Sequence, residues 1–239
     1  MTEIKQPEKL LLFGGSGAIG SATAQFFRSQ GWKVVVVSRQ SQQSVADQVC
    51  WDPLLQSHDE GLEQVAASGP YDAVCWAQGA NVNDSLYSFD LEAHEKLYRA
   101  NVLFVLTSMK GLLVKSALKK PARLCVISSI WQNMARQNKL SYCVTKSALQ
   151  GLVLSAANDL GKEGHLINAV LPGVIDTPMT RQNLSADQIN KVIDSTQFGR
   201  LASLYDVATS VYGLCSKLNT GLTGQFVTVD LGYSHVRVI

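Results

Sequence analysis

A tyrosine and a lysine lie four residues apart in the stretch Tyr142-Cys143-Val144-Thr145-Lys146. The stretch opens a run with helical spacing, and a separation of four places both side chains on one face of a helix. A nearby ammonium favours the phenolate and lowers the pKa of the tyrosine, as general acid–base chemistry on a carbonyl or an alcohol requires. Because the chain has seven tyrosines, a tyrosine and a lysine four residues apart also arise by chance. The place of this pair at the start of a helical stretch is what makes it evidence for a catalytic site.

Two serines, Ser128-Ser129, follow the apolar run Leu124–Ile127, and Ser129 stands thirteen residues before Tyr142. A continuous apolar run is typical of a strand that is buried on both faces of a parallel sheet. Ligands of such sheets bind at the carboxyl ends of the strands. A hydroxyl at this position can therefore hydrogen-bond a substrate oxygen, which makes Ser129 a candidate partner of Tyr142 and Lys146.

A glycine-rich turn follows the apolar run Leu10–Phe13 and leads into a helical pattern. Glycines allow a sharp turn and a close backbone approach, and a helix N-terminus offers unpaired N–H groups to a pyrophosphate. A glycine cluster taken alone is also compatible with a plain flexible loop. The residues expected to contact a dinucleotide here are Gly14, Ser16, Gly17, Ala18, Ile19 and Gly20.

The end of the second expected strand bears on the choice of cofactor. Val34–Val37 runs into Ser38-Arg39, with no acidic residue to accept hydrogen bonds from a ribose 2′-hydroxyl. An arginine beside a hydroxyl suits a 2′-phosphate instead. The alternative is that Arg39 is a solvated surface charge. Ser38-Arg39 lies about twenty residues after the glycine turn, and together the two features favour NADP(H) over NAD.

Strands and helices that alternate along the chain must position these residues. The apolar runs expected as strands are Leu10–Phe13, Val34–Val37, Ala73–Trp76, Leu124–Ile127, Ile167–Leu171 and Phe226–Val229, with a weaker strand that ends near Cys50-Trp51. The stretches expected as helices are Ala18–Gln30, Leu54–Ala67, Leu91–Leu118, Tyr142–Gly161, Ala186–Ser195 and Asp206–Lys217, with helix stops at Lys119-Lys120-Pro121 and Gly161-Lys162-Glu163-Gly164. Continuous alternation predicts one doubly wound α/β domain over residues 1–239, a Rossmann-like parallel sheet of about seven strands with helices on both faces.

With these elements in place, the chain resembles the short-chain dehydrogenase/reductase family over nearly its whole length. Taken together and in this order the matching motifs are highly specific, whereas none is specific alone. They are the glycine turn, Asn101 in the long middle helix, Ser129 with Tyr142 and Lys146 at the family spacing, and Pro172-Gly173-Val174-Ile175-Asp176-Thr177 after the strand that ends at Leu171.

The resemblance implies a role for each catalytic residue. Tyr142 would donate or accept the proton, and Lys146 would lower the pKa of Tyr142 and hold the nicotinamide ribose. Ser129 would orient the substrate carbonyl, and Asn101 would hold a water molecule in a proton relay to solvent. Without the family, a polar residue such as Asn101 in an apolar helical stretch would be interpreted as capped or kink-forming.

The resemblance also implies cofactor contacts beyond the glycine turn. Thr177 would hold the carboxamide of the nicotinamide, and Asp52 would contact the adenine. The further residues implied in cofactor binding are Ala77, Gln78, Gly79, Tyr142, Lys146, Pro172, Gly173 and Val174.

Three places depart from the family pattern. Phe13 stands where the family usually has threonine, Ala18 where it has glycine, and Trp76-Ala77-Gln78-Gly79 where it has Asn-Asn-Ala-Gly. Phe13 removes a hydroxyl that would tie the turn to the stretch after the fourth strand, and Trp76 and Ala77 remove two amides that would brace the centre of the sheet. We expect a bulky apolar contact to replace these polar ones. Ala18 adds one methyl group at the start of the helix, so we expect it to adjust the fit while the pyrophosphate stays at the helix N-terminus.

Composition narrows the class of function. The 239 residues are 46% hydrophobic and 17% charged with a net charge of +2, which calls for neither nucleic acid nor an anionic membrane. The five cysteines have no CxxC or metal-ligand spacing and the four histidines are scattered, so we expect a reduced, cytoplasmic compartment and no metal site. No apolar run approaches the roughly 18 residues that span a bilayer.

Two expectations concern the surroundings of the site. Residues 179–199 are expected to form a short helical lid over nicotinamide and substrate. Residues 130–141 are expected to form the opposite wall, where Arg136 meets an acidic group or a carrier phosphate, or is a solvated surface charge. The resemblance implies a homotetramer or homodimer built from the helices Leu91–Leu118 and Tyr142–Gly161, whose apolar content exceeds the needs of one sheet-facing side. The wall residues are Trp131, Gln132, Met134, Arg136 and Gln137.

The leading hypothesis is an NADP(H)-dependent oxidoreductase that transfers a hydride between nicotinamide and a small-molecule carbonyl or secondary alcohol. A 3-oxoacyl-thioester reductase is one candidate, on family frequency alone. The alternative is a nucleotide-binding regulatory or scaffold protein on the same fold that has lost turnover, which the altered strand-end motif motivates. A sugar-nucleotide epimerase is disfavoured, because 239 residues leave no room for an extra substrate domain.

Overall fold

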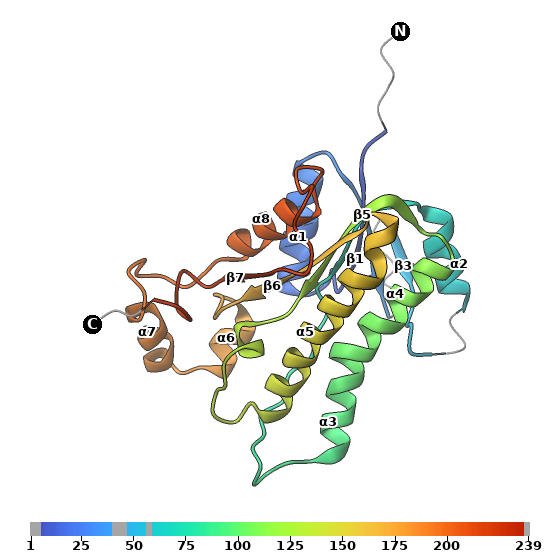
Figure 1. Cartoon of the computed structure of the whole chain (residues 1–239). Helices are drawn as coiled ribbons and strands as arrows, with labels where there is room; N and C mark the ends of the chain where they lie inside the picture. The colour runs from blue at the N-terminus through green and yellow to red at the C-terminus, as the bar shows by residue number, and fades with distance from the viewer. Residues whose placement is uncertain (1–5, 40–46, 56–58, 237–239) are drawn as a thin grey trace.

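A single sheet of seven parallel strands forms the centre of the protein (Figure 1). The structure is a computed structural model and describes residues 6–39, 47–55 and 59–236. The spatial order of the strands is β3-β2-β1-β4-β5-β6-β7, so the order reverses between β1 and β4. The strands are β1 (Lys9–Phe13), β2 (Lys33–Ser38), β3 (Gln48–Cys50), β4 (Tyr71–Trp76), β5 (Leu118–Ile127), β6 (Leu166–Pro172) and β7 (Phe226–Val229).

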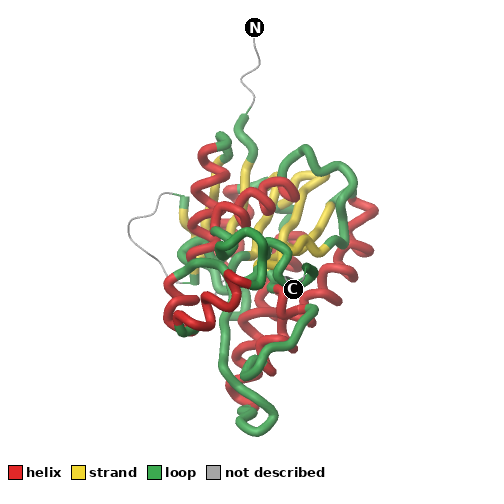
Figure 2. Tube along the Cα trace, turned by 90° about the vertical axis from the view of Figure 1, so that its left-hand side faces the viewer, coloured by secondary structure: helices red, strands yellow, loops and turns green. Residues whose placement is uncertain are grey.

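Helices cover both faces of the sheet, as the two views show (Figures 1 and 2). Successive residues of a strand point to opposite faces, so Leu10 and Leu12 of β1 pack in one hydrophobic cluster while Leu11 and Phe13 pack in the other. The strand side chains in both clusters are apolar. The strands therefore appear in the sequence as continuous apolar runs. The helices are α1 (Ala18–Ser29), α2 (Asp59–Ser68), α3 (Leu91–Tyr98), α4 (Phe104–Val114), α5 (Leu140–Leu160), α6 (Pro178–Asn183), α7 (Ala186–Asp194) and α8 (Leu204–Cys215).

The predicted fold class is confirmed: the sheet is parallel and doubly wound, and every expected strand is present. The helix expected over Leu54–Ala67 begins five residues later than predicted, at Asp59. Leu54 lies in a turn, and residues 56–58 fall outside the described part. The remaining helix ends differ from the prediction by one to a few residues.

The long helix expected over Leu91–Leu118 is wrong at its C-terminal end. Helix α4 ends at Val114, and Leu118 already pairs with Tyr71 as the first residue of β5. Lys119-Lys120-Pro121 is therefore not a helix stop but part of this strand. The Lys119 ammonium lies 2.8 Å from the Asp72 carboxylate on β4, an ion pair across two strands that local sequence does not reveal.

The middle of this helical run contains a π-helical segment, η2 (Arg99–Leu103), between α3 and α4. Leu91–Val114 forms one helical run of 24 residues that is long and apolar enough to cross a membrane by length and composition, which corrects the expectation that no apolar run approaches about 18 residues. Length and composition alone are weak grounds for a membrane span. Val102, Val105 and Met109 of the run are buried in the core cluster on the sheet, so it packs as a core helix of a globular domain.

Candidate active site

Lys146 and Tyr142 lie on adjacent turns of α5, beside the carboxyl end of β5. Lys146 is 4% exposed, and its Nζ donates a hydrogen bond to the Ile127 carbonyl oxygen at 3.1 Å. The same Nζ lies 5.6 Å from the centroid of the Tyr142 ring. Burial lowers the pKa of Lys146 to about 8, because an ammonium is poorly solvated there.

Burial has the opposite effect on the acidity of Tyr142. It raises the pKa of Tyr142 to about 12, while a hydrogen bond with Ser129 acts to lower it. In this structure the expectation that the Lys146 ammonium lowers the tyrosine pKa is therefore wrong. The Lys146 Nζ is directed to a backbone carbonyl, and desolvation of the phenolate outweighs the other effects.

The two serines after β5 have different surroundings. The Ser128 hydroxyl donates to Gln132 Oε1 at 2.8 Å, so this side chain is engaged within its own turn. Ser129 caps a short 3-10 helix, η3 (Ile130–Gln132), where its Oγ accepts the Trp131 N–H at 3.3 Å. The hydrogen bond that lowers the pKa of Tyr142 comes from Ser129, so the structure brings together Ser129, Tyr142 and Lys146 as the spacing predicts.

Asn101 lies in η2 and connects three parts of the site. Its Nδ2 donates to the Ala80 carbonyl at 3.1 Å and to Thr145 Oγ1 at 3.0 Å, and its Oδ1 accepts the Ala80 N–H at 2.8 Å. Thr145 immediately precedes Lys146, so Asn101 joins the loop after β4 to the catalytic turn of α5. Its place in a π-helical segment also fits the interpretation of a kink-forming polar residue.

Gly79 lies where this loop passes the catalytic group. A Cβ at Gly79 would stand 3.5 Å from Asn101 Oδ1 and 3.7 Å from Lys146 Nζ. The loop after β4 therefore runs directly over the site, which places Ala77, Gln78 and Gly79 where the resemblance expects cofactor contacts.

The turn between β1 and α1 has little room for side chains. Gly14 has a φ of +75°, and a Cβ on it would lie 2.5 Å from the Gln78 backbone nitrogen. A Cβ on Gly20 would lie 2.2 Å from the Gly14 carbonyl oxygen. Both positions therefore require glycine, because any larger residue would push the turn away from β4 and from α1.

The start of α1 offers donors for an anion. Gly17 is the N-cap, no side chain caps this end, and Ser21 N–H is bonded to the Gly17 carbonyl at 2.8 Å. The preceding N–H groups, from Ala18 to Gly20, belong to the first turn, which has no intrahelical acceptor. Gln78 Oε1 is buried beside this turn without a hydrogen-bond partner in the described chain. The glycine cradle, the uncapped helix end and the orphaned acceptor fit a dinucleotide.

The departures from the family pattern form one contact. Phe13 and Trp76, which pair in register on β1 and β4, stack with their ring planes 2° apart and their centroids 5.8 Å apart. Phe104 packs edge-on against Phe13, and the Trp76 Nε1 donates to Ser108 Oγ at 2.8 Å. The expected replacement of polar bracing by a bulky apolar contact is confirmed.

The residues expected at the adenosine end lie at the carboxyl ends of β2 and β3. Ser38 is the last residue of β2 and accepts a hydrogen bond from Gln48 on β3. Arg39 follows as an exposed residue. Asp52 lies just beyond β3, where its Oδ1 accepts the Leu54 N–H at 3.0 Å. Because parallel strands end at one edge, this group and the glycine turn share that edge of the sheet.

The stretch after β6 comes close to β7. A Cβ on Gly173 would lie 2.5 Å from the Asp230 Cβ, and the Gly173 N–H bonds to Val229 at 3.0 Å. Thr177 caps α6, where its Oγ1 accepts the Thr180 N–H at 3.2 Å. Pro172 and Val174 flank Gly173, so this stretch too begins at the carboxyl edge of the sheet. Helices α6 and α7 occupy the segment expected to form a lid.

Sequence reasoning missed Lys139, which lies three residues before Tyr142. Lys139 is 6% exposed, and its Nζ lies 5.9 Å from the Tyr142 ring centroid. It donates to Asn81 Oδ1 at 2.8 Å and to Asn83 Oδ1. Burial lowers the pKa of Lys139, and the Arg136 guanidinium lowers it further. The signal in the sequence was a lysine at the very start of the catalytic helix, within the expected wall.

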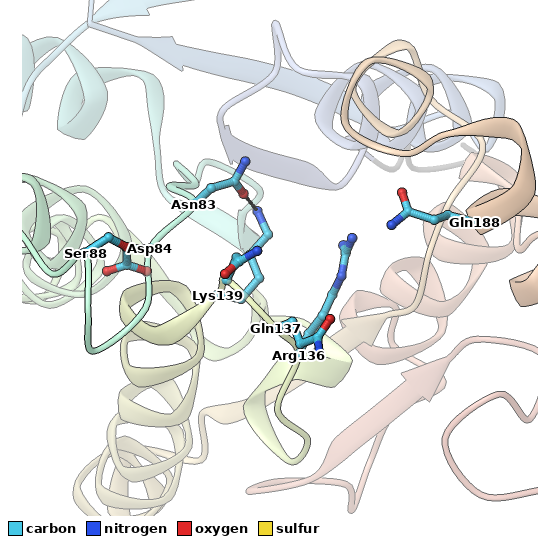
Figure 3. Close-up of a pocket in the computed structure, with 8 residues that line it drawn as sticks. Asn83, Asp84, Ser88, Arg136, Gln137, Lys139 and Gln188 are labelled. Atoms are coloured by element: carbon cyan, nitrogen blue, oxygen red, sulfur yellow. Dashed lines mark hydrogen bonds between the residues drawn. The ribbon is translucent and has the colours of Figure 1, made fainter.

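Gln132 was expected in that wall but is buried and bonded to Ser128. The open part of the wall is a cavity of about 410 Å³ lined by Arg136, Gln137 and Lys139, with Gln188 of α7 opposite (Figure 3). In the described part of the chain, no group of three His, Cys, Asp or Glu side chains is placed to hold a metal ion.

The parallel sheet, the glycine cradle at the end of β1 and the serine, tyrosine and lysine beside the end of β5 define an oxidoreductase of the short-chain dehydrogenase/reductase class. The family model described as enoyl-(acyl carrier protein) reductase matches residues 62–234, and the chain belongs to the short-chain dehydrogenase/reductase family. It is an enzyme that acts on CH–OH and C=O groups.

Two curated relatives align over most of the chain. The 3-oxoacyl-[acyl-carrier-protein] reductase of Escherichia coli is 27% identical, with 93% of this chain and 95% of that protein covered. The L-rhamnose 1-dehydrogenase (NADP(+)) of Thermoplasma acidophilum is 27% identical, with 93% and 94% covered. The crystal structure of a gluconate 5-dehydrogenase from Burkholderia cenocepacia in complex with NADP and tartrate superposes with a TM-score of 0.89 at 19% identity, covering 97% of each chain, which shows the shared fold.

Proposed function

We propose that this protein is an NADP(H)-dependent oxidoreductase that interconverts a small-molecule carbonyl and the corresponding secondary alcohol. The observation that carries the proposal is the placement of Tyr142, 5.6 Å from the Lys146 ammonium and hydrogen-bonded to Ser129, at the same sheet edge as the glycine cradle. Catalytic groups and a dinucleotide cradle on one edge bring a carbonyl and a hydride donor together.

The bound nicotinamide supplies or accepts the hydride at its C4 atom. In the direction of reduction, Ser129 orients the substrate by a hydrogen bond to the carbonyl oxygen. The Tyr142 hydroxyl donates its proton to that oxygen as the carbonyl carbon gains the hydride, which leaves an alcohol and a phenolate. A tyrosine held protonated by burial, with a pKa of about 12, is suited to be the donor in this direction. Oxidation reverses each step.

Lys146 and Asn101 support the tyrosine. When Tyr142 becomes a phenolate, the Lys146 ammonium stabilises the new negative charge, because opposite charges attract strongly in a buried site. Asn101 holds the loop after β4 against Thr145 and so fixes the turn that carries Lys146. The water relay through Asn101 and the ribose contact of Lys146 stay predictions from the family resemblance.

The preference for NADP(H) is supported by the absence of an acid at the end of β2 and by Arg39 beside Ser38. The relative from Thermoplasma acidophilum is itself named for NADP(+). We propose that Ser38 and Arg39 contact the 2′-phosphate, that Asp52 contacts the adenine, and that Thr177 holds the carboxamide.

The proposal also covers the wider molecule. Helices α6 and α7 would act as the lid, because Gln188 of α7 lines the same cavity as Arg136 and Lys139 (Figure 3). The described cysteines are all free thiols, which supports the proposal of a reducing, cytoplasmic compartment. A homo-oligomer would bury the outer sides of α4 and α5.

The test is the oxidation of NADPH, followed by its absorbance, with a panel of ketones, quinones, oxo acids and 3-oxoacyl thioesters. Tyr142→Phe is measured beside the wild type and beside Tyr98→Phe, a tyrosine at the end of α3 that carries the same loss of a phenol hydroxyl. We expect the wild type and Tyr98→Phe to turn over at least one substrate. Tyr142→Phe should lose about 100-fold or more in kcat while still binding NADPH. Tight NADPH binding without turnover of any substrate would instead favour the regulatory or scaffold alternative.

A further inference from the structure

The wall beside Tyr142 carries two cationic side chains, and this observation extends the proposed function. Lys139 and Arg136 line one cavity of about 410 Å³, a volume suited to a small ligand. The cavity lies between the loop after β4, the turn before α5 and the start of α7, and Arg136 lies between Lys139 and Gln188 in Figure 3. We propose that Lys139 and Arg136 bind the carboxylate of a short oxo acid or hydroxy acid, which is the substrate class of this enzyme.

The surroundings of Lys139 leave its charge uncompensated. Its Nζ contacts Asn81 Oδ1 and Asn83 Oδ1, which are neutral acceptors, although the side chain is almost fully buried. Within residues 6–39, 47–55 and 59–236, no carboxylate pairs with Lys139 or Arg136. A buried ammonium without a counter-ion is costly, and a bound anion would offset that cost.

The one carboxylate in the cavity lining is committed elsewhere. Asp84 is 6% exposed, and its Oδ1 accepts the Ser141 N–H at 3.0 Å while its Oδ2 accepts the Ser141 hydroxyl. His94 in turn bonds to the Ser141 hydroxyl at 2.8 Å. Asp84 therefore anchors the start of α5 and attracts Lys139 only from a distance. The asparagines hold the Lys139 ammonium in place, and a third ligand position of Nζ stays available for a substrate oxygen.

The position of Lys139 limits the length of the substrate. Its Nζ lies 5.9 Å from the centroid of the Tyr142 ring. Tyr142 is the residue that moves the proton in the proposed reaction. Because Lys139 lies beside the ring of Tyr142, a carboxylate on Lys139 and a carbonyl at the Tyr142 hydroxyl would belong to one short molecule, and 3-oxobutanoate is the shortest 3-oxo acid with a ketone group that tests this. Arg136, which is half-buried and can bind a carboxylate in a bidentate manner, would complete the contact.

The inference rests on the proposed function, and two measurements distinguish a failure of the inference from a failure of the proposed function. Turnover is measured with 3-oxobutanoate and with its methyl ester, which keeps the ketone and removes the charge. Binding is measured by saturation-transfer NMR with butanoate and methyl butanoate in the presence of NADP. The variants are Lys139→Gln, Lys139→Arg and Arg136→Gln, with Lys162→Gln as an exposed lysine control beyond the far end of α5.

We expect the wild type to prefer the acid over the ester in both measurements. Lys139→Gln should reduce the acid-to-ester ratio of kcat/KM at least about 10-fold, as expected for a lost charge-assisted hydrogen bond. Arg136→Gln should reduce it in the same direction, Lys139→Arg should restore part of it, and Lys162→Gln should not change it. Because each value is a ratio within one variant, a general loss of activity cancels.

The inference would be overturned if the wild type bound the acid and the ester equally well. It would also be overturned if Lys139→Gln and Arg136→Gln left the acid-to-ester ratio of kcat/KM unchanged. In either case, turnover of the ester would still uphold the proposed function. Selective binding of butanoate that depends on Lys139, without turnover of either ketone, would uphold the anion site and count against the oxidoreductase proposal.

Discussion

Burial changes the acidity of Tyr142 and of Lys146 in opposite directions, and both changes favour the neutral side chain. The pKa of Tyr142 rises to about 12 and that of Lys146 falls to about 8. A neutral phenol suits a proton donor, and Lys146, with a pKa of about 8, is still mostly protonated at pH about 7, so an ammonium faces the phenolate when it forms. We therefore propose that this pair favours reduction of a carbonyl at neutral pH.

The lowered pKa of Lys146 has a consequence for stability. Between pH 8 and 10.5 the unfolded chain still holds the Lys146 proton while the folded chain has lost it. The unfolded state then binds more protons, so this residue makes the free energy of unfolding rise with pH. We expect wild type to gain about 2 kcal/mol more than Lys146→Met on going from pH about 7 to about 9.5, in urea unfolding. Equal pH dependence of both proteins would contradict the burial of this ammonium.

Arg39 allows a test of the choice of cofactor. We expect Arg39→Ala to weaken NADPH about 10- to 100-fold and to leave NADH nearly unchanged, because only NADPH carries the 2′-phosphate. Fluorescence titration of both cofactors gives the two dissociation constants, and Arg28→Ala on α1 serves as a surface-arginine control. An equal loss for NADPH and NADH would refute the 2′-phosphate contact.

At the scale of elements, the stacked pair of Phe13 and Trp76 joins β1 to β4 at the point where the strand order reverses. The glycine turn begins one residue after Phe13, and the Ala77 N–H bonds to the Phe13 carbonyl at 3.0 Å. The aromatic pair therefore holds together the two strand ends that form the cradle. Aromatic packing therefore braces the centre of the sheet beside the cradle.

A double-mutant cycle measures this contact. We expect Phe13→Leu and Trp76→Leu to destabilise the protein with a coupling of about 0.5–1.5 kcal/mol, the usual size for an aromatic pair. Urea unfolding of both single variants and the double variant gives the value. Phe13→Leu combined with Phe27→Leu, in the cluster on the other face of the sheet, should be additive. Additivity of the first pair would show that the stacking contributes nothing beyond burial.

At the scale of the whole molecule, the outer sides of the long helices remain apolar. Leu106 and Val114 of α4 are 45% and 70% exposed, and Val144 and Leu154 of α5 are 44% and 50% exposed. A helix that buries one side on a sheet needs no such residues on the other side. These four exposed apolar residues fit the proposed homo-oligomer, in which two copies would pack α4 and α5 together.

The oligomer is tested by light scattering after gel filtration. We expect the wild type to form a dimer or tetramer, and the double variant Leu106→Asp with Leu154→Asp to form smaller species, because buried carboxylates oppose association. Leu55→Asp, at a residue that is 50% exposed just after β3, is the matched control and should keep the wild-type mass. A monomeric wild type would contradict the proposal.

Much of this architecture was predictable because its causes are local. A strand buried on both faces needs a continuous apolar run, and a turn that touches two neighbouring segments needs glycine, so Leu10–Phe13, Gly14 and Gly20 carry their structure in their residue types. The end of the middle helix was not predictable, because Lys119 resembles a helix stop until Asp72 on β4 comes within 2.8 Å. A contact between residues so far apart in sequence leaves no periodic signal.

The sequence by itself determined the order of the motifs, and with them the sheet, the glycine cradle and the choice of Tyr142 and Lys146 as the proposed catalytic pair. Only the tertiary structure decided what surrounds them. Burial reversed the expected direction of the Tyr142 pKa, Asn101 found its partners in a distant loop, and Lys139 became a cation beside the reacting group. Desolvation and charge depend on every segment that packs around an atom, and no stretch of sequence contains that information alone.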